Sequence, residues 1–286
     1  MVFFCVDIGG TNTLIGMGNG DFEVKKKLSS GRFLETPLET LDSMLDQEGY
    51  SRSDVDSTAV AVAGPMDKDK RVFYPPNIDT ESVDLSILGK MGELRLVNDC
   101  TSAALGEYHY GEHDSQHMVY VTVSSGVGAG MISDGDVVSG SNGNFAEVGH
   151  MTVGDRLACG CGGQGHWEAY CSGNNLPSMA SELFGVEAED AREIFDRAES
   201  GDPEAKKVIE KFRSVNSRAV SEITTLYNPD LIVFGGAVSI NHEQYLPDPE
   251  NVDSVNRAPR IEKCSLGEES VIHGLRAVCN DKMYPD

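Results

Sequence analysis

The sequence predicts an α/β protein with two mixed sheets in two similar halves. Short apolar runs that suit buried strands alternate with longer amphipathic stretches that suit helices. A strand, a glycine turn and a second strand occur within residues 2–28 and again within residues 118–138, which indicates a weak internal duplication. The 286 residues also amount to about two domains, at roughly 150 residues each.

The first half alternates strands and helices. Its strands are expected at residues 2–6, 14–17, 22–28, 58–63 and 94–97. A helix should begin with Thr36 as N-cap and Pro37 in its first turn, with Glu39 completing a capping box, and end at Gly49. A second helix, rich in small residues, is expected over residues 101–108.

The second half repeats this plan with a longer helical part. Strands are expected at residues 118–123 and 231–234, and a hairpin turns at Gly135-Asp136. Helices are expected from residue 174, from Asp202-Pro203 to about residue 226, and over 270–278, and residues 241–258 suit a loop. We place the domains at residues 1–115 and 116–267, with the C-terminal helix, about 268–286, packing back on the first.

The chain is strongly acidic, with 46 Asp and Glu against 23 Lys and Arg and a net charge of −23. This charge excludes nonspecific nucleic-acid binding through a basic face and argues against docking on anionic membranes. The acid is spread along the whole chain, so it suits either a protein of a salt-rich cytoplasm, as in a halophilic archaeon, or an ordinary acidic protein. With neither a leader sequence nor a membrane span, we expect a cytoplasmic protein.

Three glycine turns each follow an apolar strand. Glycine lets a phosphate approach backbone N–H groups, and Asp7 beside such a turn suits a divalent cation such as Mg²⁺. One such turn alone is most simply a tight hairpin, but three of them favour nucleotide binding. The candidate residues are Asp7, Gly9, Gly10, Thr11, Asn12, Thr13, Ser125, Gly126, Gly128, Gly235 and Gly236.

Two motifs carry a family resemblance. Asp-Ile-Gly-Gly-Thr-Asn-Thr at residues 7–13 resembles the first phosphate motif of the actin-like ATPase superfamily. Glu-Val-Gly-His at 147–150 and Cys-Gly-Cys-Gly-Gly-Gln-Gly-His-Trp-Glu at 159–168 resemble the signature of the ROK family of sugar kinases and sugar-responsive repressors. The resemblance implies two ribonuclease-H-like (actin-like ATPase) domains with a cleft between them, and use of ATP and Mg²⁺.

A cluster of His and Cys residues suits a structural zinc ion. His150, Cys159, Cys161 and His166 supply imidazoles and thiolates, which are typical ligands of tetrahedral Zn²⁺. The alternative is two incidental cysteines in a flexible loop. The family signature has a third cysteine where this chain has His166, so we expect a Cys2His2 site. The other five cysteines, Cys5, Cys100, Cys171, Cys264 and Cys279, suit buried thiols.

Asp99 is the candidate general base. Its position after a strand and before a helix would by itself favour a helix N-cap. The resemblance, on the pair Asn98-Asp99 and the small-residue helix that follows, implies that Asp99 accepts the proton of the sugar hydroxyl. The other sugar contacts that it implies are Asn98, Glu147, His150, Glu168 and the turn at Gly64.

These features favour an ATP-dependent hexose kinase that phosphorylates O6 of glucose. The alternative enzyme is an N-acylmannosamine or other aminosugar kinase. Gly64-Pro65 departs from the Pro-Gly that is common in the family at this turn, so the identity of the preferred sugar stays open. Segment 241–258 is shorter than its counterpart in the family, so the nucleotide preference also stays open. A repressor of the same family is disfavoured because no DNA-binding segment precedes the first phosphate motif, and an inactive sensor would lack Asp99. We expect a homodimer or homotetramer.

Overall fold

The computed structural model describes residues 2–19, 21–75, 80–141 and 143–280. These residues group into two compact units. The first combines the chain up to residue 113 with residues 136–145 and the chain from residue 269. The second holds residues 114–135 and 146–268. The sequence pattern places the main boundary near residue 115 but gives no sign that residues 136–145 group with the first unit.

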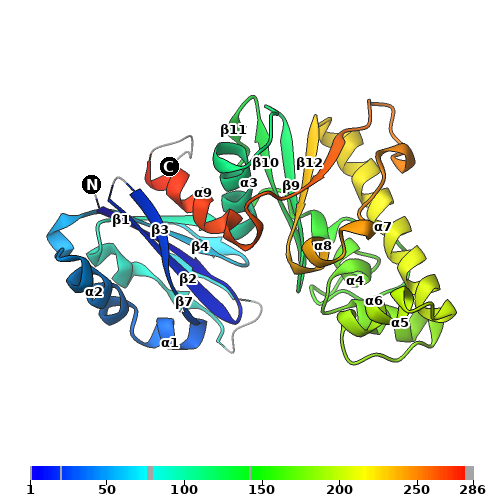
Figure 1. Cartoon of the computed structure of the whole chain (residues 1–286), viewed down its shortest axis with the longest axis horizontal. Coiled ribbons are helices and arrows are strands. Elements are labelled where there is room, and N and C mark those ends of the chain that lie inside the picture. The colour runs from blue at the N-terminus through cyan, green and yellow to red at the C-terminus, as the bar shows by residue number, and fades with distance from the viewer. Residues whose placement is uncertain (1, 20, 76–79, 142, 281–286) are drawn as a thin grey trace. The chain divides into compact units, whose positions relative to one another are not determined.

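A five-stranded mixed sheet forms the first unit, in the order β3-β2-β1-β4-β8 (Figure 1). Its strands are β1 (Val2–Ile8), β2 (Asn12–Asn19), β3 (Asp21–Ser29), β4 (Val55–Val62) and β8 (Glu93–Asn98). β1 runs antiparallel to β2 and parallel to β4, and β4 runs parallel to β8. The register aligns Ile8 with Val62 and Val62 with Asn98, so the three parallel strands end at one edge of the sheet.

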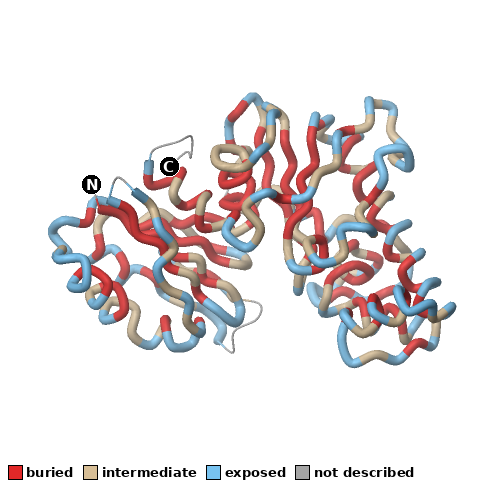
Figure 2. The backbone as a smooth tube through the Cα atoms, viewed as in Figure 1, coloured by how far each residue is buried: buried red, intermediate tan, exposed pale blue. Residues whose placement is uncertain are grey.

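Helices cover both faces of this sheet. They are α1 (Ser30–Glu35), α2 (Pro37–Glu48), α3 (Asp99–Tyr110) and α9 (Ser270–Cys279). Alternate residues of β1, such as Phe4 and Val6, join a core with Phe33 of α1 and Leu41 of α2. Cys279 of α9 contacts the opposite face at β1. Figure 2 shows β1 as an almost wholly buried strand, whereas β3 alternates between exposed and half-buried residues at the sheet edge.

Smaller elements complete the first unit. The strands β5 (Met66–Asp67), β6 (Val72–Phe73) and β7 (Val83–Asp84) form a separate antiparallel sheet. Two 3-10 turns cover Arg52–Asp54 and Ser86–Lys90.

The second unit repeats the strand order of the first, as the repeated sequence pattern predicts. Its sheet has the order β11-β10-β9-β12-β13, with β9 antiparallel to β10 and parallel to β12. The strands of this unit are β9 (Met118–Val123), β10 (Val127–Ser133), β12 (Leu231–Gly235) and β13 (Arg260–Lys263); the edge strand β11 (Asp136–Val137) is among the residues that group with the first unit. The position of β9 therefore matches that of β1, and the position of β12 matches that of β4.

The helices of the second unit follow β10 and β12. They are α4 (Trp167–Cys171), α5 (Leu176–Phe184), α6 (Ala191–Glu199), α7 (Pro203–Tyr227) and α8 (Ala237–Asn241). The long helix α7 begins as predicted, because the Asp202 side chain accepts hydrogen bonds from the N–H groups of Glu204 and Ala205. Short 3-10 turns cover Val148–His150, Glu243–Tyr245, Pro249–Asn251 and Gly267–Glu269.

One local expectation is wrong. Thr36 is the N-cap residue of α2, as predicted, but its side chain makes no capping hydrogen bond, so the predicted capping box with Glu39 is absent. The reason is that α1, which no local sequence signal indicated, ends immediately before Thr36, and the Thr36 hydroxyl donates to Arg32 O at 3.4 Å instead. The other predicted features of α2, Pro37 in its first turn and a left-handed Gly49 after its end, are confirmed.

Across the described residues, we find no helix whose length and apolar character would let it cross a membrane.

Helices α3 and α9 pack so closely that their contact requires glycine. A Cβ atom on Gly274 would lie 1.7 Å from Ser102 O, and one on Gly106 would lie 2.0 Å from Ser270 O. The Ser102 hydroxyl also donates to Val271 O at 2.8 Å. This contact ties the C-terminal helix to the helix that begins with Asp99.

We predict that Gly274→Ala lowers the free energy of unfolding by about 1–3 kcal/mol or more, because the new methyl group forces the two backbones apart. Gly31→Ala is the matched control. Gly31 lies in α1, and a Cβ atom added there would meet nothing within 4 Å, so this change should be neutral or stabilising. Urea unfolding of both variants measures the effect, and equal stabilities would contradict the close packing.

Candidate functional site

The first glycine turn lies between β1 and β2 with its tip exposed. Gly10, Thr11 and Asn12 are exposed, and Gly9 N–H donates to Asn12 O at 3.0 Å to close the turn. Thr13, by contrast, is fully buried. The turn can therefore receive a ligand at residues 10–12, whereas Thr13 supports it from below.

Ser30 anchors this turn, and sequence reasoning did not find it. The Ser30 hydroxyl donates to Gly9 O at 2.6 Å and lies 3.1 Å from the hydroxyl of Thr13. The Ser30 N–H donates to Thr11 O at 3.0 Å. Ser30 is itself buried at the start of α1. The only sequence signal was that Ser30 comes directly after an alternating strand. Nothing in the local pattern indicates that its hydroxyl contacts Gly9 and Thr13, which lie 21 and 17 residues earlier in the chain.

Two acidic residues lie at the edge of the sheet where the parallel strands end. Asp7 is half-buried near the end of β1, and Asp99 directly follows β8 as the first residue of α3. Burial, together with the negative charge of Asp99, raises the pKa of Asp7 to about 7. The negative charges of these two carboxylates repel each other. Such a pair suits a divalent cation, whose positive charge would offset the repulsion.

The structure separates the roles of Asn98 and Asp99. Asn98 is the N-cap of α3, because its Oδ1 accepts from Thr101 N at 3.1 Å. Asp99 Oδ1 accepts the N–H of the next residue, Cys100, at 2.8 Å. The alternative interpretation of Asp99 as the N-cap is therefore wrong. Asn98 is nearly buried, and capping uses its side-chain oxygen, so its amide nitrogen is the group left for a ligand.

Gly64 belongs to the same edge of the first sheet. It follows β4 two residues after Val62, and its φ of +115° lies in the region that favours glycine. The first glycine turn, Gly64 and the pair Asn98-Asp99 thus each follow one of three adjacent parallel strands. The sequence predictions for the first unit converge on this edge.

The second glycine turn connects β9 to β10 and is held by Glu168. The Glu168 Oε2 accepts the N–H of Val127 at 3.0 Å, and a Cβ on Gly126 would lie 2.7 Å from the same oxygen. Gly173 N–H donates to Ser124 O at 2.6 Å, and Asn174 N–H to Ser125 O at 3.3 Å. Glu168 therefore supports the backbone of this turn, a role that the sequence did not indicate.

The third glycine turn has its own packing reasons for glycine. A Cβ on Gly235 would lie 2.0 Å from the hydroxyl oxygen of Tyr120. Gly236 has a φ of +83°, and a Cβ there would lie 2.5 Å from Thr122 Oγ1. These two glycines are required by the fold of the second unit whether or not a nucleotide binds there.

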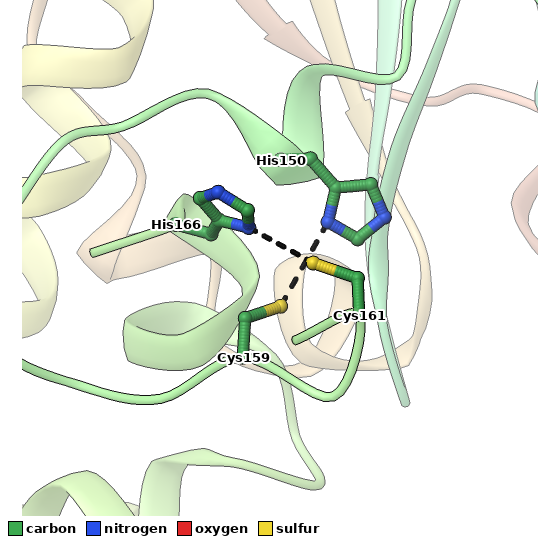
Figure 3. Close-up of side chains that lie close together, drawn as sticks. All are labelled: His150, Cys159, Cys161 and His166. Carbon is green, nitrogen blue, oxygen red and sulfur yellow. Dashed lines mark hydrogen bonds between the residues drawn. The ribbon is translucent and has the colours of Figure 1, made fainter. Parts of the chain in front are cut away.

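The four predicted metal ligands come together in the second unit (Figure 3). One donor atom from each of His150, Cys159, Cys161 and His166 lies within 4.8 Å of the others. Cys161 Sγ lies 3.2 Å from His166 Nδ1, and Cys159 Sγ lies 3.8 Å from His150 Nδ1. Ligands of a tetrahedral zinc ion lie about 3.3–3.8 Å apart, given the usual bond lengths. The donor set therefore fits Zn²⁺, and the two Cys–His distances lie near this range.

Backbone hydrogen bonds shape the loop that carries these ligands. Gly162 N–H donates to Cys159 O and Cys159 N–H donates to Gly163 O, each at 2.9 Å, which closes a tight turn around both cysteines. Trp167, fully buried in α4 next to His166, donates from Nε1 to Asn216 Oδ1 of α7 at 2.8 Å. The loop is thus folded by its own contacts and fastened to the long helix.

Glu147 lies beside the metal ligands, one residue before the 3-10 turn that carries His150. Desolvation of its carboxyl group raises the pKa of Glu147; His150 opposes this effect, and the negative charge of Glu168 adds to it. The electrostatic influence of Glu168 indicates that the two predicted sugar-contacting carboxylates are close enough to interact. The second unit therefore holds Glu147, Glu168, the four metal ligands and the second and third glycine turns.

We predict that Asp7→Asn stabilises the protein at high pH. The folded-state pKa of Asp7 is raised to about 7, above the value of about 3.9 expected in the unfolded chain. The ionised side chain therefore costs stability fully above pH 7, less at pH 5 and nothing below about pH 4. The midpoint of thermal unfolding should rise by several degrees at pH 8 and by less at pH 5. An equal shift at both pH values for Asp7→Asn would contradict the prediction.

Comparison with known proteins gives a consistent result. The ROK family model matches residues 3–274. A glucokinase of Aeropyrum pernix is 32% identical over 270 residues, covering 84% of this chain and 83% of the relative. An N-acetylmannosamine kinase of Shigella boydii is 30% identical over 251 residues and covers 84% of each chain. The solved structure of a ROK hexokinase from Thermus thermophilus is 26% identical, covers 96% of each chain and has a TM-score of 0.76. The chain belongs to the ROK family and has its actin-like ATPase fold.

Proposed function

We propose that this chain is an ATP-dependent hexose kinase that transfers the γ-phosphate of ATP to O6 of glucose. The observation that carries the proposal is the edge of the first sheet, where Asp7 and an exposed glycine turn lie at the end of β1 and Asp99 follows β8, the second parallel strand along from β1. A phosphate-binding turn and a carboxylate that can accept a proton are the groups that phosphoryl transfer to an alcohol needs.

Asp99 is proposed as the general base, and its backbone environment prepares it for that role. It is the first residue of α3; Asn98 caps the helix by accepting the Thr101 N–H, and Asp99 Oδ1 accepts the Cys100 N–H, which fixes the carboxylate at the helix start. We propose that Asn98 binds sugar hydroxyls through its amide nitrogen. Phosphoryl transfer depends mainly on positioning and charge stabilisation, so a fixed base at a helix start suits the reaction.

Magnesium is proposed to act beside the first glycine turn. Asp7 would hold the ion directly or through water, and the raised pKa of this carboxyl group supports a site for positive charge. When bound, Mg²⁺ neutralises the negative charge of the phosphates that must react.

The sugar is proposed to contact Glu147, His150 and Glu168 as well as the turn at Gly64. Glu168 can do so through Oε1 while Oε2 holds the N–H of Val127. The more similar curated relatives include both glucokinases and N-acetylmannosamine kinases. We place glucose first because the two glucokinases are 32% and 33% identical, and keep the N-acylmannosamine as the alternative substrate.

A structural zinc ion is proposed at His150, Cys159, Cys161 and His166. It would hold His150 through Nδ1, the nitrogen that faces Cys159, and leave Nε2 of the same ring available to the sugar. His166 directly precedes α4, which carries Glu168, so the ion would also fix the start of that helix. The proposed role of zinc is thus to connect two sugar-binding side chains.

We predict that the purified protein contains about one zinc ion per chain and that His166→Asn loses it. Loss of the ion should weaken glucose binding and lower the midpoint of thermal unfolding. His117→Asn is the control, because His117 lies in the same unit but outside the cluster. Elemental analysis measures the zinc content of wild type and both variants. Wild-type protein without zinc would contradict the proposed zinc site. Full zinc content in His166→Asn would exclude His166 as a ligand.

We predict that Asp99→Asn lowers kcat by about 10²–10⁴-fold, the usual contribution of a general base. The fold should persist, because an asparagine oxygen can still accept the Cys100 N–H and Asn98 still caps α3. Asp46→Asn, remote from the site in α2, should retain full activity. Glucose binding measured by calorimetry should remain within a few-fold of wild type in both variants. Turnover of Asp99→Asn within about tenfold of wild type would exclude Asp99 as the base.

The assay that tests the proposed function is ADP release with glucose, mannose, fructose, N-acetylglucosamine and N-acetylmannosamine. Running it at low and at molar KCl also tests whether the surface acid adapts the enzyme to high salt, which we propose as its working condition. Preference for N-acetylmannosamine would favour the alternative substrate. No turnover with any of these sugars under either condition would contradict the proposed function.

A further inference from the structure

Ser30 contacts the first glycine turn through both its backbone and its side chain. Its N–H donates to Thr11 O at 3.0 Å, and its hydroxyl donates to Gly9 O at 2.6 Å. The Ser30 side chain is buried, with only 1% of the residue exposed, so water does not compete for these bonds. Two carbonyl groups of the turn are therefore fixed on the side that faces α1.

The direction of each hydrogen bond follows from the single proton of the Ser30 hydroxyl. That proton is donated to Gly9 O, so in the 3.1 Å contact between the two hydroxyls Ser30 must accept and Thr13 must donate. The Thr13 proton is thereby used within the protein. Thr13 is consequently an internal support of the turn and not a donor to a ligand.

Fixing a carbonyl also fixes the amide N–H that follows it. In a planar trans peptide the C=O and the N–H point in opposite directions. Because Gly9 O points at the Ser30 hydroxyl, Gly10 N–H points to the opposite side of the turn. Gly10 is exposed, and its N–H makes no backbone hydrogen bond among the described residues. The same geometry turns Asn12 N–H away from Ser30, because Thr11 O accepts the Ser30 N–H.

We propose that Ser30 is a positioning residue for the phosphates of the nucleotide. By holding two carbonyls on one side of the turn, it presents the N–H groups of Gly10 and Asn12 on the other side as a concave donor site for an anion. The inference rests on the proposed function, because it takes the anion to be the phosphates of ATP. It adds a residue of α1 to a site otherwise made from strand ends and turns.

Ser30→Ala tests this role, because it removes the hydroxyl and leaves the backbone N–H in place. The Gly9–Gly10 peptide then loses its anchor and must be ordered when the nucleotide binds. We expect the affinity for magnesium-AMPPNP, a non-hydrolysable ATP analogue, to fall about tenfold, as for loss of a partly buried hydrogen bond to a backbone carbonyl. The affinity for glucose should stay within about twofold, because no sugar-binding group contacts Ser30.

Ser29→Ala is the matched control. Ser29 is the adjacent residue of the same type, it is exposed, and its side chain makes no capping hydrogen bond. This variant should bind AMPPNP and glucose as wild type does. Ser30→Thr keeps the hydroxyl and should recover most of the nucleotide affinity. If Ser30→Ala is too unstable to assay, Thr13→Val removes the donor to Ser30 and should weaken AMPPNP binding by a smaller factor.

Calorimetric titrations of each variant with magnesium-AMPPNP and with glucose separate the outcomes. A selective loss of nucleotide affinity in Ser30→Ala, restored in Ser30→Thr, supports the positioning role. Wild-type nucleotide affinity in Ser30→Ala, or a parallel loss of both affinities, overturns it. Failure of the wild-type protein itself to bind AMPPNP overturns the proposed function as well, so the two failures are distinguishable.

Discussion

The shared register of three parallel strands is the constraint on which the candidate site of the first unit depends. Because β1, β4 and β8 end together, the residues that follow them occupy one edge of the sheet even though they are far apart in sequence. Strand alternation then places Asp7 on the face of β1 opposite to Phe4 and Val6, which pack against α1 and α2. Asp7 thus lies on the side of the sheet where α3 and Asp99 can reach it electrostatically.

The second unit has the same strand order but presents its functional residues in a different way. Its ligand-rich segment follows β10 and contains no regular helix before α4, so sheet geometry alone cannot place the side chains. Local hydrogen bonds between residues 153 and 165 fold the segment back on itself, and the buried Trp167 fixes its end to α7. A metal ion at the cluster would add cross-links to a loop that is already shaped, which suits a structural role.

How much of the fold could be predicted depends on whether the signal is local. The strand β9 and the long helix α7 were predicted within a residue of their bounds, because apolar runs and the Asp-Pro start of α7 are local patterns. The Cys and His spacing likewise predicted the cluster of four ligands. Ser30 and the brace from Glu168 to Val127 were not found, because these hydrogen bonds join residues 21 and 41 positions apart. The sequence left an N-cap role open for Asp99, whereas the structure gives that role to Asn98, since both residue types suit an N-cap.

Glycine turns that looked equivalent in the sequence differ in what requires the glycine. At Gly126, Gly235 and Gly236 a side chain would collide with a carboxylate, a tyrosine ring or the neighbouring backbone, so packing alone accounts for glycine there. Gly10 is different: it is exposed, and its φ does not lie in the region that favours glycine. A small residue with an outward N–H is what the close approach of an anion needs at that point.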